Sequence, residues 1–211
     1  MVPVRVLRPR NAALAAAGAT AAAALWWRAN PSACPYGQRF WVQAPHPFIT
    51  RARLREILAP QPGERVLEVG PGTGYYALEV AEWLAPDGRL DVFDLQQEML
   101  DHTLGRAHER GITSIEATCG DATALPYADG TFDAAYLVTV LGEIPDQEAA
   151  LRELRRVLRP AGRLVVGELV GDPHVVTLGR LQARAAAAGL SFERRVGPAF
   201  GYFARFAPVA T

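Results

Sequence analysis

The stretch VLEVGPGTGYY, Val66 to Tyr76, places three glycines within five positions directly after a short apolar run. Such a run is typical of a buried strand, and Tyr76 to Leu84 have the apolar spacing of a helix. Glycine tolerates a positive φ and lets a ligand approach the backbone, while the start of a helix presents unpaired N–H groups. We therefore expect a strand, a ligand-binding turn and a helix. Tight packing of the strand on the helix is the alternative explanation of the glycines.

The same alternation of short β-type runs and longer helical runs continues along the chain. It predicts strands at 89–94, 113–121, 132–140 and 163–169, helices at 96–111, 146–162 and 178–189, and a closing antiparallel pair at 191–197 and 200–209. This order predicts an α/β fold, a Rossmann-like doubly wound, mostly parallel seven-stranded sheet with a terminal antiparallel hairpin. Ligands of such sheets bind beyond the carboxyl ends of the strands.

Composition excludes several classes of function. The 211 residues, half of them hydrophobic, suffice for one domain with a substantial core. The 22 acidic and 22 basic residues balance, so nucleic acid is not expected as a partner. Every basic residue counted there is arginine, and the absence of lysine excludes a P-loop, a pyridoxal Schiff base and a short-chain dehydrogenase.

Cys34, Cys119 and the four scattered histidines match no metal-ligand spacing, so no metal is predicted. Two cysteines so far apart suit a reducing compartment better than a disulfide framework. A cytoplasmic location follows as an expectation.

Residues 1–28 form an alanine-rich segment whose uncharged run, 11–27, lies between Arg10 and Arg28. As a helix this run would span about 25 Å, against a hydrocarbon core of about 30 Å. Three interpretations remain open: an anchor or interfacial helix at the inner face of a membrane, an alanine-rich helix packed on the domain, and a cleaved signal peptide. Residues 29–50, rich in proline and aromatic residues, predict a linker or a lid before a domain at 51–211.

A second acid strengthens the prediction of a ligand site. Asp94 ends the second predicted strand, 20 residues after Gly74, where a carboxylate can accept both hydroxyls of a ribose. A surface or helix-capping role is the alternative. The glycine spacing is GxGxG, whereas the dinucleotide fingerprint is GxGxxG.

Four motifs occur in a characteristic order: Glu68 with GPGTG, then VFDLQQEML, then GDATALPYADGTFDAAYLVTVLGEIPD, and then ALRELRRVLRPAGRLVVGE. Together they resemble the class I S-adenosylmethionine-dependent methyltransferases, in particular the ubiquinone/menaquinone C-methyltransferases and the small bacterial phospholipid N-methyltransferases. The resemblance covers about residues 51–209 and implies S-adenosylmethionine as the cofactor. It assigns the methionine part to Glu68, Gly70, Gly72 and Gly74, the ribose and adenine to Asp94, Leu95, Asp121 and Ala122, and the floor beneath the sulfonium to Val138 and Thr139.

Methyl transfer from a sulfonium depends chiefly on positioning, so no catalytic side chain is obligatory. If the acceptor must lose a proton, Glu143 is the foremost candidate base, followed by His46, Tyr36 and His174. A solvated loop acid is the alternative for Glu143. Many relatives have two histidines where this chain has Gly142 and Glu143, a departure that weakens any transfer of the quinone substrate.

The aromatic residues Tyr36, Phe40, Trp41 and Phe48 predict a lid over a small-molecule or lipid-like acceptor, with core packing as the alternative. Two other functions remain open: a nicotinamide-dependent oxidoreductase on the same sheet, and a non-catalytic binding protein with the same fold.

Overall fold

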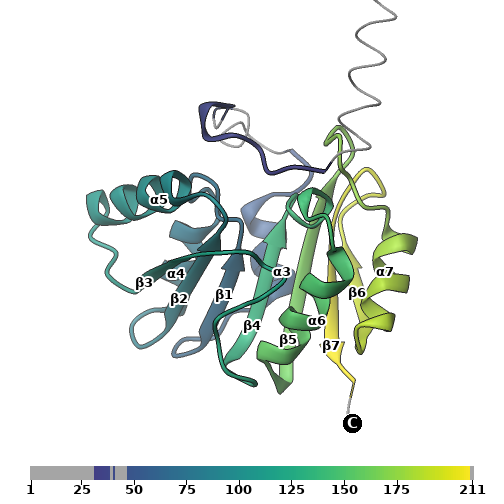
Figure 1. The fold of residues 1–211 in the computed structure, drawn as a ribbon. Helices are drawn as coiled ribbons and strands as arrows, with labels where there is room; N and C mark the ends of the chain where they lie inside the picture. The colour runs from purple at the N-terminus through teal and green to yellow at the C-terminus, as the bar shows by residue number, and fades with distance from the viewer. Residues whose placement is uncertain (1–30, 39, 41–46, 210–211) are drawn as a thin grey trace, which may run out of the picture.

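The computed structural model describes residues 31–38, 40 and 47–209 (Figure 1). Seven strands form one sheet in the order β3-β2-β1-β4-β5-β7-β6. Neighbours from β3 to β5 are parallel, and β7 runs antiparallel to both β5 and β6. The predicted fold class is confirmed. The strands are β1 (Arg65–Val69), β2 (Arg89–Asp94), β3 (Ile115–Cys119), β4 (Phe132–Val138), β5 (Leu158–Leu169), β6 (Leu190–Val196) and β7 (Gly201–Pro208).

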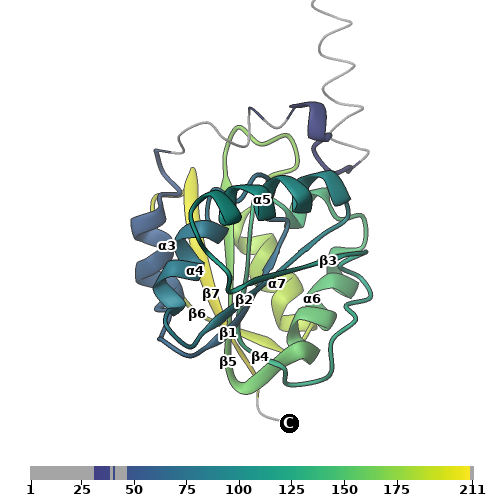
Figure 2. The same cartoon turned by 90° about the vertical axis from the view of Figure 1, so that its left-hand side faces the viewer.

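Helices cover both faces of the sheet, as Figure 2 shows with the sheet seen nearly along its plane. One face carries α3 (Arg51–Leu58), α4 (Ala77–Leu84) and α5 (Gln97–Glu109), and the other carries α6 (Gln147–Val157) and α7 (Leu178–Ala187). Two short 3-10 helices, η1 (Tyr36–Gln38) and η2 (Leu141–Glu143), lie at the edge formed by the carboxyl ends of the parallel strands.

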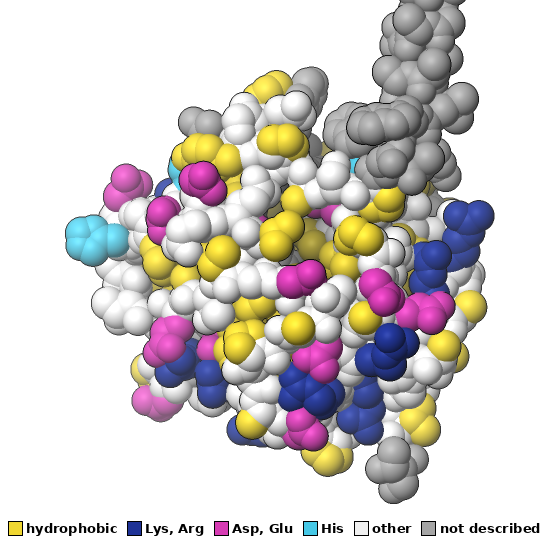
Figure 3. Space-filling view, in the orientation of Figure 1, with side chains coloured by type: hydrophobic (Ala, Val, Ile, Leu, Met, Phe, Trp, Pro, Cys, Tyr) yellow, Lys and Arg dark blue, Asp and Glu magenta, His cyan; other side chains and the backbone are white. Residues whose placement is uncertain are grey.

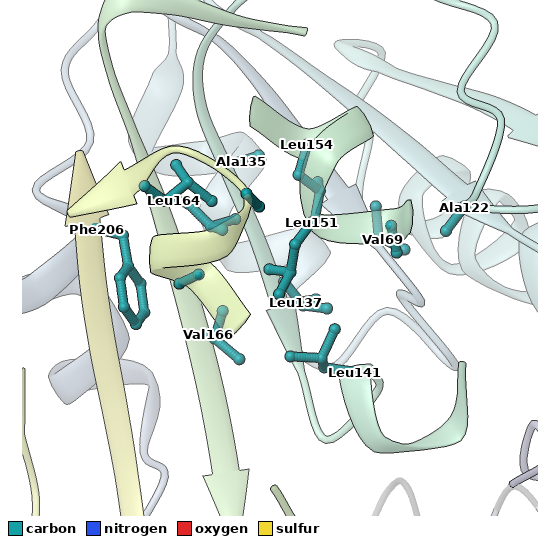
Figure 4. Packing of buried hydrophobic residues seen from close by; sticks show 14 of the residues in the cluster. Val69, Ala122, Ala135, Leu137, Leu141, Leu151, Leu154, Leu164, Val166 and Phe206 are labelled. Carbon is teal, nitrogen blue, oxygen red and sulfur yellow. The ribbon is translucent and has the colours of Figure 1, made fainter. Parts of the chain in front are cut away.

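The apolar face of α6 explains how the second layer is held. Leu151 and Leu154 are fully buried and lie against Leu137 and Val69 of the sheet (Figure 4). Burial of each such leucine contributes about 1.5–3 kcal/mol. The packing fixes the loop that leads from β4 into α6, and that loop carries Glu143.

Two predicted boundaries were wrong. The helix expected at 146–162 ends at Val157, because Pro160 has no N–H to continue it. The residues from Leu158 onward instead begin β5, whose register shifts between the pairs of Phe132 and Ala134. The strand expected at 132–140 ends at Val138, since Thr139 turns the chain with a φ of 56°.

The N-terminal edge of the domain is also integrated into the fold. Ile49 is fully buried, and the Thr50 side chain caps α3 by accepting from the N–H of Arg53. The predicted segment 11–27 lies outside the described residues. Among the described helices, none has the length and apolar character needed to cross a membrane.

The topology defines where a ligand can bind. The chain passes from β1 to β2 on one side and reaches β4 on the other, so the strand order reverses beside β1. In open parallel sheets the crevice at this point is the usual ligand site.

Candidate active site

A pocket of about 370 Å³ opens at this reversal point, at the carboxyl ends of β1, β2 and β4. Its volume lies within the range of roughly 300–1,000 Å³ that is common for small-molecule sites. Glu68 and Gly74 do not line it. The other predicted site residues do: Gly70, Gly72, Asp94, Leu95, Asp121, Ala122, Val138, Thr139 and Glu143.

The glycine turn serves both the pocket and the protein's own packing. Gly70, Gly72 and Gly74 have φ values of 72°, 55° and 76°, a region that favours glycine. A Cβ on Gly70 would lie 2.4 Å from Cγ2 of Val140, and one on Gly74 would lie 3.1 Å from Cγ2 of Thr103. Close internal packing therefore requires Gly70 and Gly74, while Gly70 and Gly72 also line the pocket.

Asp94 lies where the sequence placed it, at the end of β2 and in the pocket wall. Its carboxylate accepts from the N–H of Gln96 at 2.9 Å and is further stabilised by the amides of Gly72 and Leu95. Desolvation outweighs these bonds and raises the pKa of Asp94 above its ordinary value. A ligand with a positive charge or with hydroxyl groups would compensate part of the solvation that this carboxylate has lost.

The predicted adenine edge has a partly structural role. Asp121 accepts from the N–H of Thr123 at 2.8 Å, which closes a local turn and places Ala122 in the pocket wall. The preceding position requires a glycine, Gly120, because a Cβ there would lie 2.7 Å from the ring of Phe93. Leu95, also in the wall, is 62% exposed, so its side chain has apolar surface available to a ligand.

Glu68 is buried beneath the site. It accepts from the hydroxyl of Tyr136 at 2.7 Å, and burial raises its pKa to about 8. The negative charge of Asp94 contributes to this rise, so the two acids are close enough to interact.

Glu143, the candidate base, lies in η2 and lines the pocket. Its Oε2 accepts from the N–H of Cys34 at 3.3 Å. Desolvation, followed by the charge of Asp172, raises the pKa of Glu143 to about 8. Of the other candidates, Tyr36 lies 3.4 Å from Nδ1 of His102 and outside the pocket lining.

The two remaining candidate bases occupy other places. His174 lines a neighbouring cavity, and His46 lies outside the described residues.

The segment Pro31–Gln38, here called the strap, crosses the pocket, and its first four residues form part of the wall (Figure 1). Gln96 binds it twice: its Oε1 accepts from the N–H of Tyr36 at 3.1 Å, and its Nε2 donates to the carbonyl of Cys34 at 2.9 Å. Together with Glu143, Gln96 fastens the strap from opposite sides of the pocket.

The cysteines and the predicted lid aromatics are placed separately. Cys34 is half-buried and Cys119 exposed, both as free thiols. Phe48 packs on Phe200 with ring centroids 4.6 Å apart, and Phe40 is 57% exposed. Trp41 lies outside the described residues.

Sequence reasoning missed three polar residues of this edge: Gln96, Glu168 and Asp172. Glu168 is 1% exposed and accepts from the N–H of Val176 at 3.0 Å, while its Oε1 has no hydrogen-bond partner in the described structure. Burial raises the pKa of Glu168 to about 8. A signal was available, because Gln96 lies inside VFDLQQEML and Glu168 is the second-last residue of the strand predicted at 163–169.

The charge of the pocket wall is one-sided. Among the described residues that line it, Asp94, Asp121 and Glu143 are acidic and none is basic, although the chain contains 22 arginines. Buried carboxylates with raised pKa values favour a cationic ligand and disfavour a pyrophosphate. These acids suit the positively charged sulfonium and ammonium groups of S-adenosylmethionine, and Asp94 suits the hydroxyl groups of its ribose.

Comparison with known proteins supports the same family. The sequence profile of the ubiE/COQ5 methyltransferase family matches residues 46–178, more than half of the chain. The ubiquinone/menaquinone biosynthesis C-methyltransferase UbiE of Shewanella oneidensis is 32% identical over 132 residues, which are 62% of this chain and 52% of that protein. A protein-L-isoaspartate O-methyltransferase of Methanopyrus kandleri is 31% identical over 70% of this chain and 61% of its own length.

Among solved structures, a SAM-dependent methyltransferase from Aquifex aeolicus superposes with a TM-score of 0.77 at 18% identity, covering 84% of this chain and 100% of that one. That likeness shows the fold. The chain spans about half the length of relatives such as the Shewanella enzyme. The family match confirms the predicted methyltransferase family. The chain belongs to the ubiE/COQ5 methyltransferase family.

Proposed function

We propose that the protein transfers a methyl group from S-adenosylmethionine to a small or amphiphilic acceptor. The acidic pocket, whose described lining residues include no basic one, carries this proposal, because a nicotinamide dinucleotide would bring in a pyrophosphate for which that lining offers no cation. When bound, S-adenosylmethionine supplies a methyl group that is already activated on a positively charged sulfur. The protein must therefore position the acceptor against the methyl group and exclude water from the site.

Each part of the pocket has a defined task in this proposal. Asp94 binds the ribose hydroxyls, and the backbone of Gly70 and Gly72 lets the methionine part lie close to the turn. Thr139, held by its N–H bond to the carbonyl of Gly167 at 2.8 Å, forms the floor at the end of β4. The strap covers the site and keeps water from the reacting atoms.

Glu143 serves as the base for an acceptor that must lose a proton. Its Oε1 takes that proton, while Oε2 stays bonded to the N–H of Cys34. Because the free protein holds the pKa of Glu143 at about 8, the carboxylate form becomes available only as the pH rises toward 8. A nearby cation stabilises the carboxylate, so the bound cofactor lowers this pKa.

A pH profile tests the role of Glu143. We expect kcat/KM to rise with pH through a midpoint at or below pH 8 to a plateau above it, and Glu143→Gln to lower kcat/KM about 100-fold or more and remove the rise. Glu148→Gln, an exposed acid of α6, is the matched control and should behave as the parent. An unchanged profile in Glu143→Gln would exclude Glu143 as the base.

The acceptor is proposed to be apolar in part. Leu95, Val170 and Phe200 are large apolar residues at this edge with exposed fractions of 62%, 60% and 48%. Together with the uncharged run 11–27 of the sequence, they favour a lipid-like or quinone-like acceptor and association with the inner face of a membrane.

Ligand-dependent melting tests the cofactor independently of turnover. At about 100 times its dissociation constant a ligand adds about 2.7 kcal/mol, which is about 5–10 °C for a chain of this size. S-adenosylmethionine and its demethylated product should both raise Tm, and NADH should not. Asp94→Asn should lose most of this shift, and the exposed Asp87→Asn should retain it. A shift with NADH alone would refute the proposal.

The acceptor can then be identified with cofactor labelled on its methyl group. The protein is incubated with a cell extract that is afterwards split into lipid and aqueous fractions. Label in the lipid fraction supports the lipid-like acceptor, and label in the aqueous fraction alone refutes it. No label in either fraction, with the cofactor bound, favours the non-catalytic alternative.

A further inference from the structure

A second cavity, here called the basic cavity, lies beside the cofactor pocket and has the opposite charge. It measures about 130 Å³ and is lined on its polar side by Gln147, His174, Arg180 and Arg184. Among its described lining residues there is no carboxylate. The two sites at this edge of the sheet are thus one acidic and one basic.

The basic cavity adjoins the place where methyl transfer is proposed. Pro31 of the strap lines both spaces, and Gly142, which lines the basic cavity, directly precedes Glu143, which lines the pocket. A Cβ on Gly142 would lie 1.8 Å from the carbonyl oxygen of His174, so the two loops are in direct contact. The two cavities are therefore adjacent, separated by the turn at Gly142 and Glu143 and bordered by Pro31.

The two arginines of the basic cavity have no acid partner among the described residues. Arg180 is exposed and forms no hydrogen bond or ion pair within the described structure, and Arg184 bonds to the neutral amide of Gln147. By contrast, Arg163 of β5 is paired through two hydrogen bonds with Glu64. The nearest acid along the chain, Asp172, accepts from the N–H of His174 at 2.7 Å and is not part of the lining.

The start of α7 adds to the positive potential. Its N-cap, Thr177, makes no side-chain capping bond, and its first turn contains no acid. The unpaired N–H groups of a helix start attract anions. On the side of the molecule that carries α6 and α7, Figure 3 shows several arginine side chains at the surface.

We propose that the basic cavity binds an anionic group of the methyl acceptor, a phosphate, sulfate or carboxylate, while the atom that receives the methyl group lies beside Glu143. This inference rests on the proposed function for the presence of an acceptor. A volume of about 130 Å³ corresponds to roughly four waters at ~30 Å³ each, enough for one such group. Arginine is well suited to it because its planar donors match the oxygens of these anions.

Binding of inorganic phosphate to the full chain tests the cavity without any methyl transfer. Melting is followed against phosphate concentration, with chloride at the same ionic strength as reference. Phosphate should stabilise the parent protein, and Arg180→Gln should need about ten times more phosphate for the same effect, since a charge-assisted bond is lost. Arg152→Gln, an exposed arginine of α6, is the matched control and should resemble the parent.

Several outcomes would overturn the inference. If phosphate gives no more stabilisation than chloride, or acts equally on the parent and on Arg180→Gln, the basic cavity is not an anion site. Melting with S-adenosylmethionine in parallel separates the two proposals: cofactor binding without phosphate binding refutes the anion site alone, and the reverse refutes the proposed function alone.

Vesicles distinguish a lipid headgroup from a free small anion. The full chain is sedimented with phosphatidylcholine vesicles that contain or lack phosphatidic acid. If the group belongs to a lipid, Arg180→Gln should bind less to the vesicles with phosphatidic acid than the parent does. Arg152→Gln should bind to them as the parent does. If vesicle binding is the same in all variants while phosphate binding falls in Arg180→Gln, the group belongs to a soluble acceptor.

Discussion

Gln96 joins Asp94, the proposed ribose-binding acid, to the strap, so replacing Gln96 should release the bound cofactor faster. The side chain makes two hydrogen bonds to the strap, at 3.1 and 2.9 Å, whereas its backbone N–H bonds to Asp94. Gln96→Met keeps the volume of the side chain and the backbone bond but removes both strap bonds. At about 0.5–1.5 kcal/mol each, their loss favours opening by about 1–3 kcal/mol, which is about 5- to 150-fold.

The assay is a chase of labelled S-adenosylmethionine by excess unlabelled cofactor. The dissociation rate of Gln96→Met should exceed that of the parent by this factor, with little change in Tm because the side chain is only half-buried. Gln97→Met is the matched control, since the adjacent Gln97 is exposed and bonds to Asp101 within α5. Equal rates in the parent, Gln96→Met and Gln97→Met would refute the role of the strap.

Opening of the strap can also be measured without the cofactor. Cys34 is half-buried under the strap's own bonds, and burial raises the pKa of its thiol. In a Cys119→Ser background, which removes the exposed thiol, the rate of Cys34 labelling by a thiol reagent should rise in Gln96→Met by a similar factor. A constant labelling rate would show that Gln96 does not hold the strap closed.

Three sets of substitutions test the supporting structure. Burial raises the pKa of Glu168 from 4.5 to about 8, so the folded state keeps a proton that the unfolded chain loses, and the free energy of unfolding falls as the pH rises between these values. In urea unfolding, the stability of Glu168→Gln relative to the parent should increase from pH 5 to pH 8 by a few kcal/mol, at most about 4. An equal difference at both pH values would mean that Glu168 is ionised when folded. Gly70→Ala should lower the free energy of unfolding by about 2–4 kcal/mol in thermal unfolding, because its Cβ would collide with Val140. Adding Val140→Ala should recover part of this loss. If the effects of the two substitutions simply add, the contact is contradicted. Arg163→Met should cost about 3–5 kcal/mol by leaving Glu64 unpaired, and the double variant with Glu64→Gln should be more stable than Arg163→Met in urea unfolding.

The sequence was sufficient to predict that the residues proposed to bind the cofactor lie together. The glycines and Asp94 are fixed by local structure: each follows directly at the end of a strand, and the carboxyl ends of neighbouring parallel strands meet at one edge. Knowing the strand order is then enough to bring Gly70, Gly72 and Asp94 together. The wrong boundary at Val157 has a local cause as well, since the periodicity of α6 runs past the point where Pro160 stops it.

The acceptor half could not be predicted in the same way, because its parts come from loops far apart in the sequence. Cys34 meets Glu143 across 109 positions, and the turn before Glu143 can lie against the carbonyl of His174 because Gly142 has no side chain. No periodicity encodes such contacts. The charge pattern follows from the same geometry. The chain is evenly balanced in composition, yet among the described lining residues one cavity has acids and no basic residue, and the next has arginines and no acid. Such a separation is unfavourable without ligands of opposite charge, because burial removes water from these groups: desolvation, and after it the charge of Asp172, raises the pKa of Glu143. A cationic cofactor beside an acceptor with an anionic group would neutralise both cavities at once.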